Sequence, residues 1–260
     1  MKIVLIRHGA TAGNIKKRYI GITDEDLCAS GIESIHNNIK AGYYQEVQAV
    51  YVSPMKRCRQ TAKLIYPEYK QHIVPDFREC DFGIFEGKNY KELSGNEQYQ
   101  RWIDSNATIP FPQGEDVADF KKRSVKGWYD MIKQCRLLNY SDIACVIHGG
   151  TIMSVMSEIY GGGYYDYHCG NGDGYICDVA LDGSINNYTE LLRCEITDAK
   201  SEKVLYESGV IKPGTYIEKL SPTMDLDNTA RDITVKVYAY KDGSWYSAGT
   251  TIMNMKLQPW

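Results

Sequence analysis

The sequence has no excess of positive charge. Among its 260 residues, 30 Lys and Arg stand against 33 Asp and Glu, a net charge of −3. Binding along a nucleic acid or an anionic membrane needs a basic surplus, so neither is expected as a partner. No apolar run approaches the ~20 residues that cross a bilayer. The apolar stretch near Met1 is too short for a signal peptide, which predicts a cytoplasmic protein.

Paired cysteines are absent as well. The eight Cys residues are scattered, no two of them form a CxxC pair, and none lies after Cys194. A zinc ribbon or a dithiol redox motif is therefore not indicated. A secreted disulfide framework would not leave the end of so long a chain unlinked. We expect reduced, mostly buried thiols, and we predict neither a metal nor another cofactor.

Strand and helix patterns alternate from residue 1 to about residue 182. The expected strands are short apolar runs, at residues 3–6, 47–52, 143–147 and 175–181. The expected helices have apolar residues three and four positions apart, over residues 30–43, 54–65, 116–138 and 151–160. Ser30 is the expected N-cap of the first helix, and Ser53 followed by Pro54 opens the second. This alternation predicts an α/β fold, a mainly parallel sheet with helices on both faces.

The pattern changes after residue 183. Apolar and polar residues alternate with a period of two at 233–240 and 252–257, with the turn sequence 241–244 between them. We therefore predict two units, an α/β domain over 1–182 and a small all-β, sandwich-like domain over 183–260. The second unit is expected to be structural or to mediate self-association.

Two histidines occupy equivalent places in the predicted sheet. His8 and His148 each follow a buried strand, and a glycine follows each of them. Ligands of open α/β sheets bind beyond the carboxyl ends of the strands, so both histidines are expected in one crevice. Arg7, beside His8, offers two parallel N–H donors to a phosphate or a carboxylate.

Further charged groups are expected near this crevice. Arg57 lies in the first turn of a predicted helix, whose N-terminus attracts anions. Glu79, Asp81 and Glu86 supply carboxylates in a segment punctuated by glycines. The sequence therefore predicts a crevice with anion-binding groups and carboxylates close together.

Together these segments resemble the histidine phosphatase superfamily, also called phosphoglycerate mutase-like. Four motifs occur in the family's order and spacing: RHGxTxxN from Arg7, SPxxRxxQTA from Ser53, RExxFGxxEG from Arg78 and HGG from His148. The resemblance covers about residues 1–182 and implies the phosphoglycerate mutase-like fold. Two positions depart from the family, which often has Glu or Gln instead of Ala10 and a larger residue instead of Gly13.

The resemblance implies a role for each matching residue. His8 would attack phosphorus and form a phosphohistidine, and Glu79 would protonate the leaving oxygen and later activate water. Arg7, Arg57 and a protonated His148 would hold the phosphoryl oxygens and supply the charge that a metal supplies elsewhere. Substrate-binding residues would line the phosphate pocket, namely Thr11, Asn14, Ile20, Gly21 and Gly149.

Some nearby residues have alternative interpretations. Asp81 is the alternative general acid, whereas Glu86 is interpreted as a carboxylate that holds the loop. His36 and His72 are expected to be ordinary surface residues. His168 lies in a loop rich in Tyr and Gly and could border the pocket.

The resemblance favours a phosphatase over a mutase. The stretch between Glu79 and His148 is short and has no adjacent pair of arginines for a second phosphate. Small bacterial phosphatases of the α-ribazole or broad-specificity kind look most similar, and the expected partner is a small-molecule phosphate ester. A cofactor-dependent phosphoglycerate mutase is the alternative, and a non-catalytic phosphate-binding protein is the second alternative.

Overall fold

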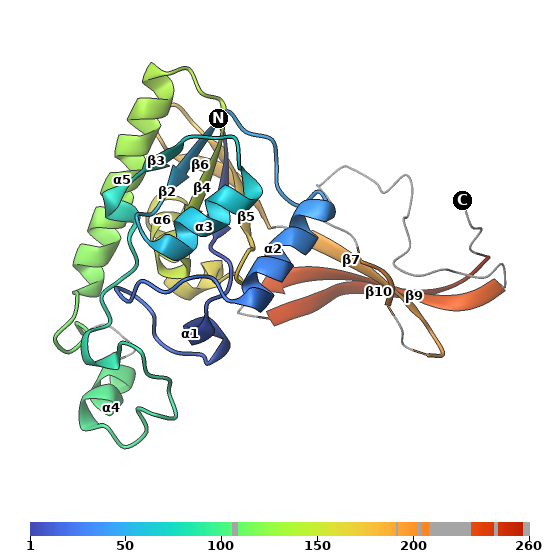
Figure 1. Ribbon diagram of the computed structural model, residues 1–260, viewed down its shortest axis with the longest axis horizontal. Helices are drawn as coiled ribbons and strands as arrows, with labels where there is room; N and C mark the ends of the chain where they lie inside the picture. The colour runs from blue at the N-terminus through green and yellow to red at the C-terminus, as the bar shows by residue number, and fades with distance from the viewer. Residues whose placement is uncertain (106–108, 191, 202–203, 208–229, 242–243, 257–260) are drawn as a thin grey trace.

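The central feature of the computed structural model is a six-stranded sheet in the order β3-β2-β4-β1-β5-β6 (Figure 1). The structure describes the chain except residues 106–108, 191, 202–203, 208–229, 242–243 and 257–260. The strands are β1 (Lys2–Arg7), β2 (Ala49–Val52), β3 (Gln71–Ile73), β4 (Asp142–Ile147), β5 (Gly174–Val179) and β6 (Ile185–Glu190). Strands β1 to β4 are parallel, whereas β5 and β6 are antiparallel to their neighbours. The predicted α/β fold with a mainly parallel sheet is confirmed.

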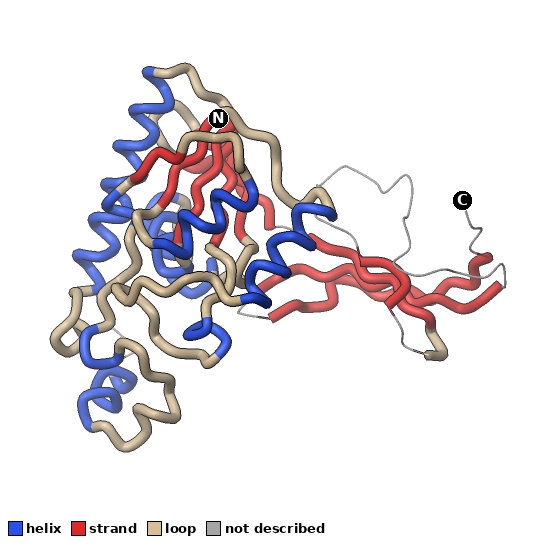
Figure 2. Tube along the Cα trace, in the orientation of Figure 1, coloured by secondary structure: helices blue, strands red, loops and turns tan. Residues whose placement is uncertain are grey.

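Helices cover both faces of this sheet (Figures 1 and 2). On one face, α5 (Val117–Leu137) and α6 (Gly149–Ile159) pack against strand side chains such as Ile3 and Leu5. On the other face, α3 (Lys56–Ile65) packs against Val4 and Ile6, and α2 (Ala29–Lys40) lies beside α3. Successive strand residues point to opposite faces, so a strand covered on both sides is a continuous apolar run.

Several short elements were not expected from the sequence. They are α1 (Ala12–Ile15), α4 (Glu97–Asp104) and the 3₁₀ turns η1 (Pro75–Phe77), η2 (Gly83–Phe85) and η3 (Tyr164–Tyr167). Each is too short for a helical repeat of apolar residues to be recognised. No helix in the described ranges is long and apolar enough to cross a membrane.

Two predicted helix starts are wrong. Ser53 is not the N-cap of α3, which begins at Lys56 after Met55; its hydroxyl lies 2.7 Å from Nε2 of His148 and accepts from the N–H of Met55 over 3.4 Å. Helix α2 begins at Ala29, so Ser30 lies inside its first turn. The N–H of Lys56, the first residue of α3, donates to Oδ1 of Asp24 over 2.7 Å, so a side chain distant in the sequence supports the start of α3.

A second sheet follows β6, with the antiparallel order β10-β9-β7-β8. Its strands are β7 (Leu192–Asp198), β8 (Val204–Glu207), β9 (Ala230–Lys241) and β10 (Ser244–Lys256). Strand β6 lies beyond residue 182 but pairs with β5, so the first sheet extends to Glu190. The described strands after β6 form one sheet and do not include a facing second sheet, and the two-domain division stays a prediction.

Candidate active site

The carboxyl ends of β1 and β4 bring the two predicted histidines together. These strands are parallel neighbours, with Arg7 in register with Ile147. The backbone N–H of His8 donates to the Ile147 carbonyl over 3.0 Å. The rings of His8 and His148 lie edge to face, with centroids 5.2 Å apart. Strand pairing thus creates the crevice that the sequence predicted.

His8 is held as a neutral ring with a defined tautomer. Its Nδ1 lies 2.7 Å from the carbonyl oxygen of Gly9, which can only accept, so Nδ1 carries the proton. Burial, together with the charges of Arg57 and Arg7, lowers the pKa of His8 well below its usual range. A neutral ring protonated on Nδ1 has its lone pair on Nε2, and this nitrogen can act as a nucleophile.

His148 has the opposite tautomer. Nε of Arg57 donates to Nδ1 of His148 over 3.3 Å, so the His148 proton is on Nε2, which donates to the Ser53 hydroxyl. Burial and the Arg57 charge lower the pKa of His148 well below its usual range. The expected protonated form of His148 is therefore disfavoured here, because a second buried cation would lie beside Arg57, away from solvent.

Arg57 is completely buried behind the two histidines. Besides its contact with His148, its guanidinium donates to the carbonyl oxygens of Thr23 (2.9 Å), Gly21 (2.9 Å) and Ile20 (3.3 Å). These bonds compensate for the loss of water around a buried charge. Arg57 thus supplies positive potential to the site and fixes the loop around Gly21.

Arg7 has a donor that the protein leaves unused. One terminal nitrogen donates to the carbonyl of Cys169 over 2.6 Å. Its Nε is buried and has no partner among the described residues. A Cβ atom on Gly149 would lie 3.3 Å from this Nε, so glycine allows Arg7 to pack closely at this position. A buried donor without a partner is costly, and an oxygen of a bound phosphate would satisfy it.

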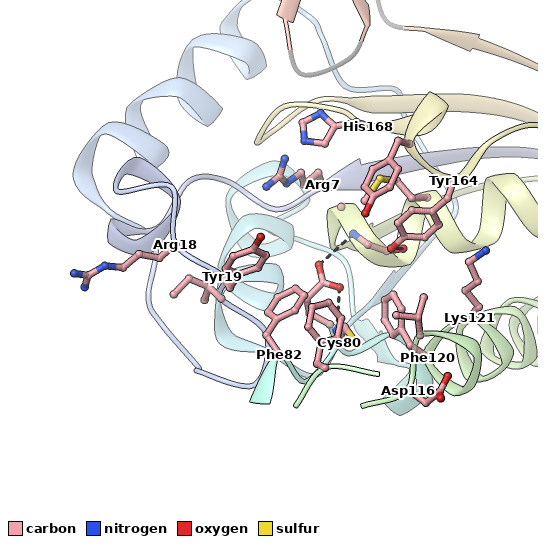
Figure 3. Close-up of a pocket in the computed structure, with 18 of the residues that line it drawn as sticks. Arg7, Arg18, Tyr19, Cys80, Phe82, Asp116, Phe120, Lys121, Tyr164 and His168 are labelled. Atoms are coloured by element: carbon pink, nitrogen blue, oxygen red, sulfur yellow. Dashed lines mark hydrogen bonds between the residues drawn. The ribbon is translucent and has the colours of Figure 1, made fainter. Parts of the chain in front are cut away.

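A cavity of about 620 Å³ lies over these groups (Figure 3). Six of the predicted site residues line it, namely Arg7, His8, Asn14, Ile20, Glu79 and Gly149. Arg57, His148, Thr11 and Gly21 are not among its described lining residues. Thr11 caps α1 through a reciprocal pair of hydrogen bonds with Asn14. The site therefore divides into groups that face the cavity and groups that support them from behind.

Glu79 enters the cavity as a buried carboxyl group, 8% exposed. Its Oε1 accepts from the backbone N–H of Cys80 over 3.0 Å, and its Oε2 accepts from that of Gly150 over 3.2 Å (Figure 3). Burial raises the pKa of Glu79, although these hydrogen bonds and the Arg57 charge oppose the shift. A carboxyl group with a raised pKa and fixed oxygens is suited to donating a proton.

Arg123 on α5 was missed at the sequence level. It forms a two-pronged ion pair with Glu115, over 2.6 and 2.7 Å, and also donates to the backbone carbonyl of Glu79 over 2.9 Å. It thereby fixes the backbone that carries the carboxyl group. The sequence offered one indication of this role: Arg123 lies three positions after Phe120, beside the buried residues of α5.

The two other carboxylates of the Glu79 segment have structural contacts. Oδ1 of Asp81 accepts from the N–H of Gly83 over 2.8 Å, and Asp81 is not among the cavity's described lining residues. Oε1 of Glu86 accepts from the N–H groups of Gly21 and Thr23, each over 2.8 Å. Glu86 therefore holds the loop, as interpreted, and the geometry does not favour Asp81 as the acid.

The remaining histidines lie in three different environments. His36 is exposed on α2, as expected. His72 is half-buried in β3 and stacks on Tyr51, with ring centroids 5.0 Å apart. His168 lines the cavity near Arg7 (Figure 3). Within the described residues, no three His, Cys, Asp or Glu side chains are grouped as metal ligands would be.

Comparison with known proteins agrees with this geometry. The family model of the histidine phosphatase superfamily (branch 1) matches residues 3–180. The adenosylcobalamin/alpha-ribazole phosphatase of Escherichia coli is 28% identical over 166 residues, 62% of this chain and 80% of that protein. A 2,3-bisphosphoglycerate-dependent phosphoglycerate mutase of Bartonella quintana is 30% identical over 170 residues, 61% and 81% of the two chains.

A solved structure shows the same fold. The crystal structure of phosphoserine phosphatase from Entamoeba histolytica, in complex with 3-phosphoglyceric acid, has a TM-score of 0.60 and 24% identity, over 73% of this chain and 96% of that one. Because the family model spans most of the chain, the protein belongs to the histidine phosphatase superfamily. The predicted family and the predicted enzyme class, a phosphatase, are confirmed.

Proposed function

We propose that this member of the histidine phosphatase superfamily hydrolyses a small phosphate monoester through a phosphohistidine on His8, with Glu79 as general acid and base. The observation that carries the proposal is the fixed tautomer of His8, whose Nδ1 donates to Gly9 and whose Nε2 keeps its lone pair. Glu79 lines the same cavity with a raised pKa. A nucleophile and an acid in one cavity are what ester cleavage requires.

In the first step, Nε2 of His8 forms a bond to phosphorus as the ester P–O bond breaks. The electron pair of that bond goes to the leaving oxygen, which takes the proton of Glu79 and departs as an alcohol. The phosphate dianion raises the pKa of Glu79 further while it is bound, which keeps the acid protonated until then. Arg7, which lines the cavity, stabilises the charge on the transferring group through its guanidinium.

In the second step, Glu79 is a carboxylate and acts as the base. It takes a proton from water as the water oxygen bonds to phosphorus and the P–Nε2 bond breaks. The electron pair of that bond returns to Nε2 of His8, and inorganic phosphate leaves. Arg57 provides positive potential from behind both histidines, and direct contact of Arg57 and His148 with the phosphoryl oxygens stays a prediction.

Substitution of His8 tests the proposal. His8→Ala is expected to lower kcat/KM for p-nitrophenyl phosphate on the order of 10³-fold or more, because the nucleophile is lost. The matched control is His36→Ala, since His36 is exposed on α2 and is not among the cavity's described lining residues. Denaturing the wild type in alkali during turnover should give a protein with one added phosphoryl group on the peptide that contains His8. Equal activity of His8→Ala and wild type would refute the proposal.

A phosphoglycerate mutase is the second candidate, because one of the relatives has that name. Both reactions share the phosphohistidine, and they differ in whether water or phosphoglycerate accepts the phosphoryl group. We therefore propose to incubate the enzyme with 3-phosphoglycerate, with and without a bisphosphate primer. Release of inorganic phosphate supports the phosphatase, and primer-dependent isomerisation without release supports the mutase.

Because β6 belongs to the first sheet, the accessory β unit predicted for residues 183–260 is proposed to be the sheet β7 to β10 that follows it, and to support self-association. This sheet motivates the proposal, because among the described strands its outer members, β8 and β10, each pair with one neighbour. The test is the mass of the full chain by sedimentation over a range of concentrations. A strictly monomeric chain at all concentrations would contradict it.

A further inference from the structure

One wall of the cavity is aromatic. Its rings belong to segments far apart in the sequence and come together through tertiary packing; they are Tyr19, Phe82, Trp102, Phe111 and Phe120. Phe82 lies 5.3 Å from Tyr19 and 5.0 Å from Phe111, measured between ring centroids, in both cases edge to face. Trp102 stacks on Phe111 with centroids 5.0 Å apart. An apolar leaving group bound against these ring faces would bury apolar surface.

The cationic side chains of the cavity's rim already have anionic partners. Among the described lining residues, three are Arg or Lys: Arg7, Arg18 and Lys121. Arg18 forms two bonds with Glu92, over 2.6 and 3.2 Å, and Figure 3 shows it extending away from the aromatic rings. Arg7 lies at the phosphate end of the cavity. Arg18 therefore does not offer a free charge to a leaving group.

Lys121, the second cation of the rim, has two contacts. Nζ of Lys121 lies 2.9 Å from Glu158 and 5.1 Å from the centroid of the Tyr164 ring. On the same rim, Asp116 contributes a carboxylate, held by the N–H of Ala118 as the cap of α5. A carboxylate on the leaving group that reached this rim would face the negative charge of Asp116, while Arg18 and Lys121 of the described rim are already paired, which is unfavourable.

We propose that the enzyme selects phosphate monoesters of uncharged, apolar or aromatic alcohols and discriminates against esters with a carboxylate beside the phosphate. This inference rests on the proposed function and specifies its substrate class. The aromatic wall provides the attraction, and the neutralised rim provides the discrimination. Phe82 is the specificity-determining side chain at the centre of the wall, because it contacts both Tyr19 and Phe111.

The test compares alkyl esters whose alcohols leave with similar ease. We expect kcat/KM for 2-phenylethyl phosphate to exceed that for ethyl phosphate by about 10- to 100-fold, the gain from burying one aromatic ring. 3-Phosphoglycerate and phosphoserine should react no faster than ethyl phosphate. If either carboxylate ester reacts as fast as 2-phenylethyl phosphate, the inference is wrong. If His8→Ala keeps activity on these esters, the proposed function fails instead, so the two failures are distinguishable.

The variant Phe82→Ala tests whether the aromatic wall causes the preference for 2-phenylethyl phosphate. Phe82→Ala is expected to reduce the ratio of kcat/KM for 2-phenylethyl phosphate to that for ethyl phosphate by about 3- to 10-fold, since part of the ring's contact is lost. Tyr90→Ala is the matched control, because Tyr90 is 55% exposed and lies outside the described lining of the cavity. A ratio unchanged in Phe82→Ala would overturn the role of this residue. The substrate series on the unaltered protein decides the main proposal even if Phe82→Ala does not fold.

Discussion

Replacing Gly150 with Ala should displace the proposed acid while leaving the fold intact. The added Cβ would lie 2.4 Å from Oε1 of Glu79 and 3.1 Å from Cζ of Phe120. The carboxyl group would have to retreat by about 0.6 Å to reach even 3.0 Å, and its bond to the N–H of Gly150 would be strained. Misplacement of a reacting group by ~1 Å can cost 10²-fold, so we expect a loss of about 10- to 100-fold.

The assay compares two esters whose leaving groups differ in their need for a proton. For an alkyl ester, the departing oxygen needs the proton of Glu79, whereas p-nitrophenolate leaves without one. In Gly150→Ala, kcat/KM should fall about 10- to 100-fold for ethyl phosphate and much less for p-nitrophenyl phosphate. Because kcat/KM reports the steps up to phosphoenzyme formation, the later role of Glu79 as base does not affect this comparison. Glu79→Gln should show the same dependence on the leaving group.

The melting temperature distinguishes a displaced Glu79 carboxyl group from a loss of folding in Gly150→Ala. Gly150 lies in α6, where Ala is about 1 kcal/mol more favourable than Gly, which offsets part of the contact with Phe120. The melting temperature should therefore stay within a few degrees of the wild type, and Ser157→Ala on the same helix provides the control. An equal loss for both esters, or no loss for ethyl phosphate at wild-type stability, would refute the assigned position of the acid.

Two further predictions concern stability and pH. Arg123→Ala should lower the free energy of unfolding by about 2 to 4 kcal/mol, measured with urea, because Glu115 loses its two-pronged partner and keeps only the longer contact with Arg78, over 3.9 Å. Arg123→Lys should recover stability more than kcat, and full recovery of both would contradict a positioning role. The kcat/KM for ethyl phosphate should fall below the lowered pKa of His8, which must be neutral, and above the raised pKa of Glu79, which must be protonated. The alkaline fall should be absent with p-nitrophenyl phosphate, and an identical alkaline fall for both esters would exclude Glu79 as the acid.

Most of the fold could be predicted because its evidence is local. The buried strands are continuous apolar runs, and their order with the helices indicated a parallel α/β sheet. Helix α5 begins after Asp116, whose side chain accepts from Ala118 two residues later, a pattern visible in the sequence. The start of α3 at Lys56 could not be predicted, because the side chain that accepts from the Lys56 N–H belongs to Asp24, which is distant in the sequence. The pairing of β6 with β5 was not predicted either. The change of sequence pattern after residue 182 suggested a domain boundary there, although β6 continues the first sheet.

The sequence by itself determined the chemistry of the site: a histidine after each of two strands, arginines near them, and a carboxylate in a glycine-punctuated segment. Those residues follow strand ends, and parallel strands bring their ends to one edge of the sheet. Only the tertiary structure decided which nitrogen of each histidine carries its proton, since Gly9, Ser53 and Arg57 set the tautomers. It also decided that the N–H of Gly150 binds the Glu79 carboxyl group and that one wall of the cavity is aromatic. Those contacts join residues that no local sequence pattern relates.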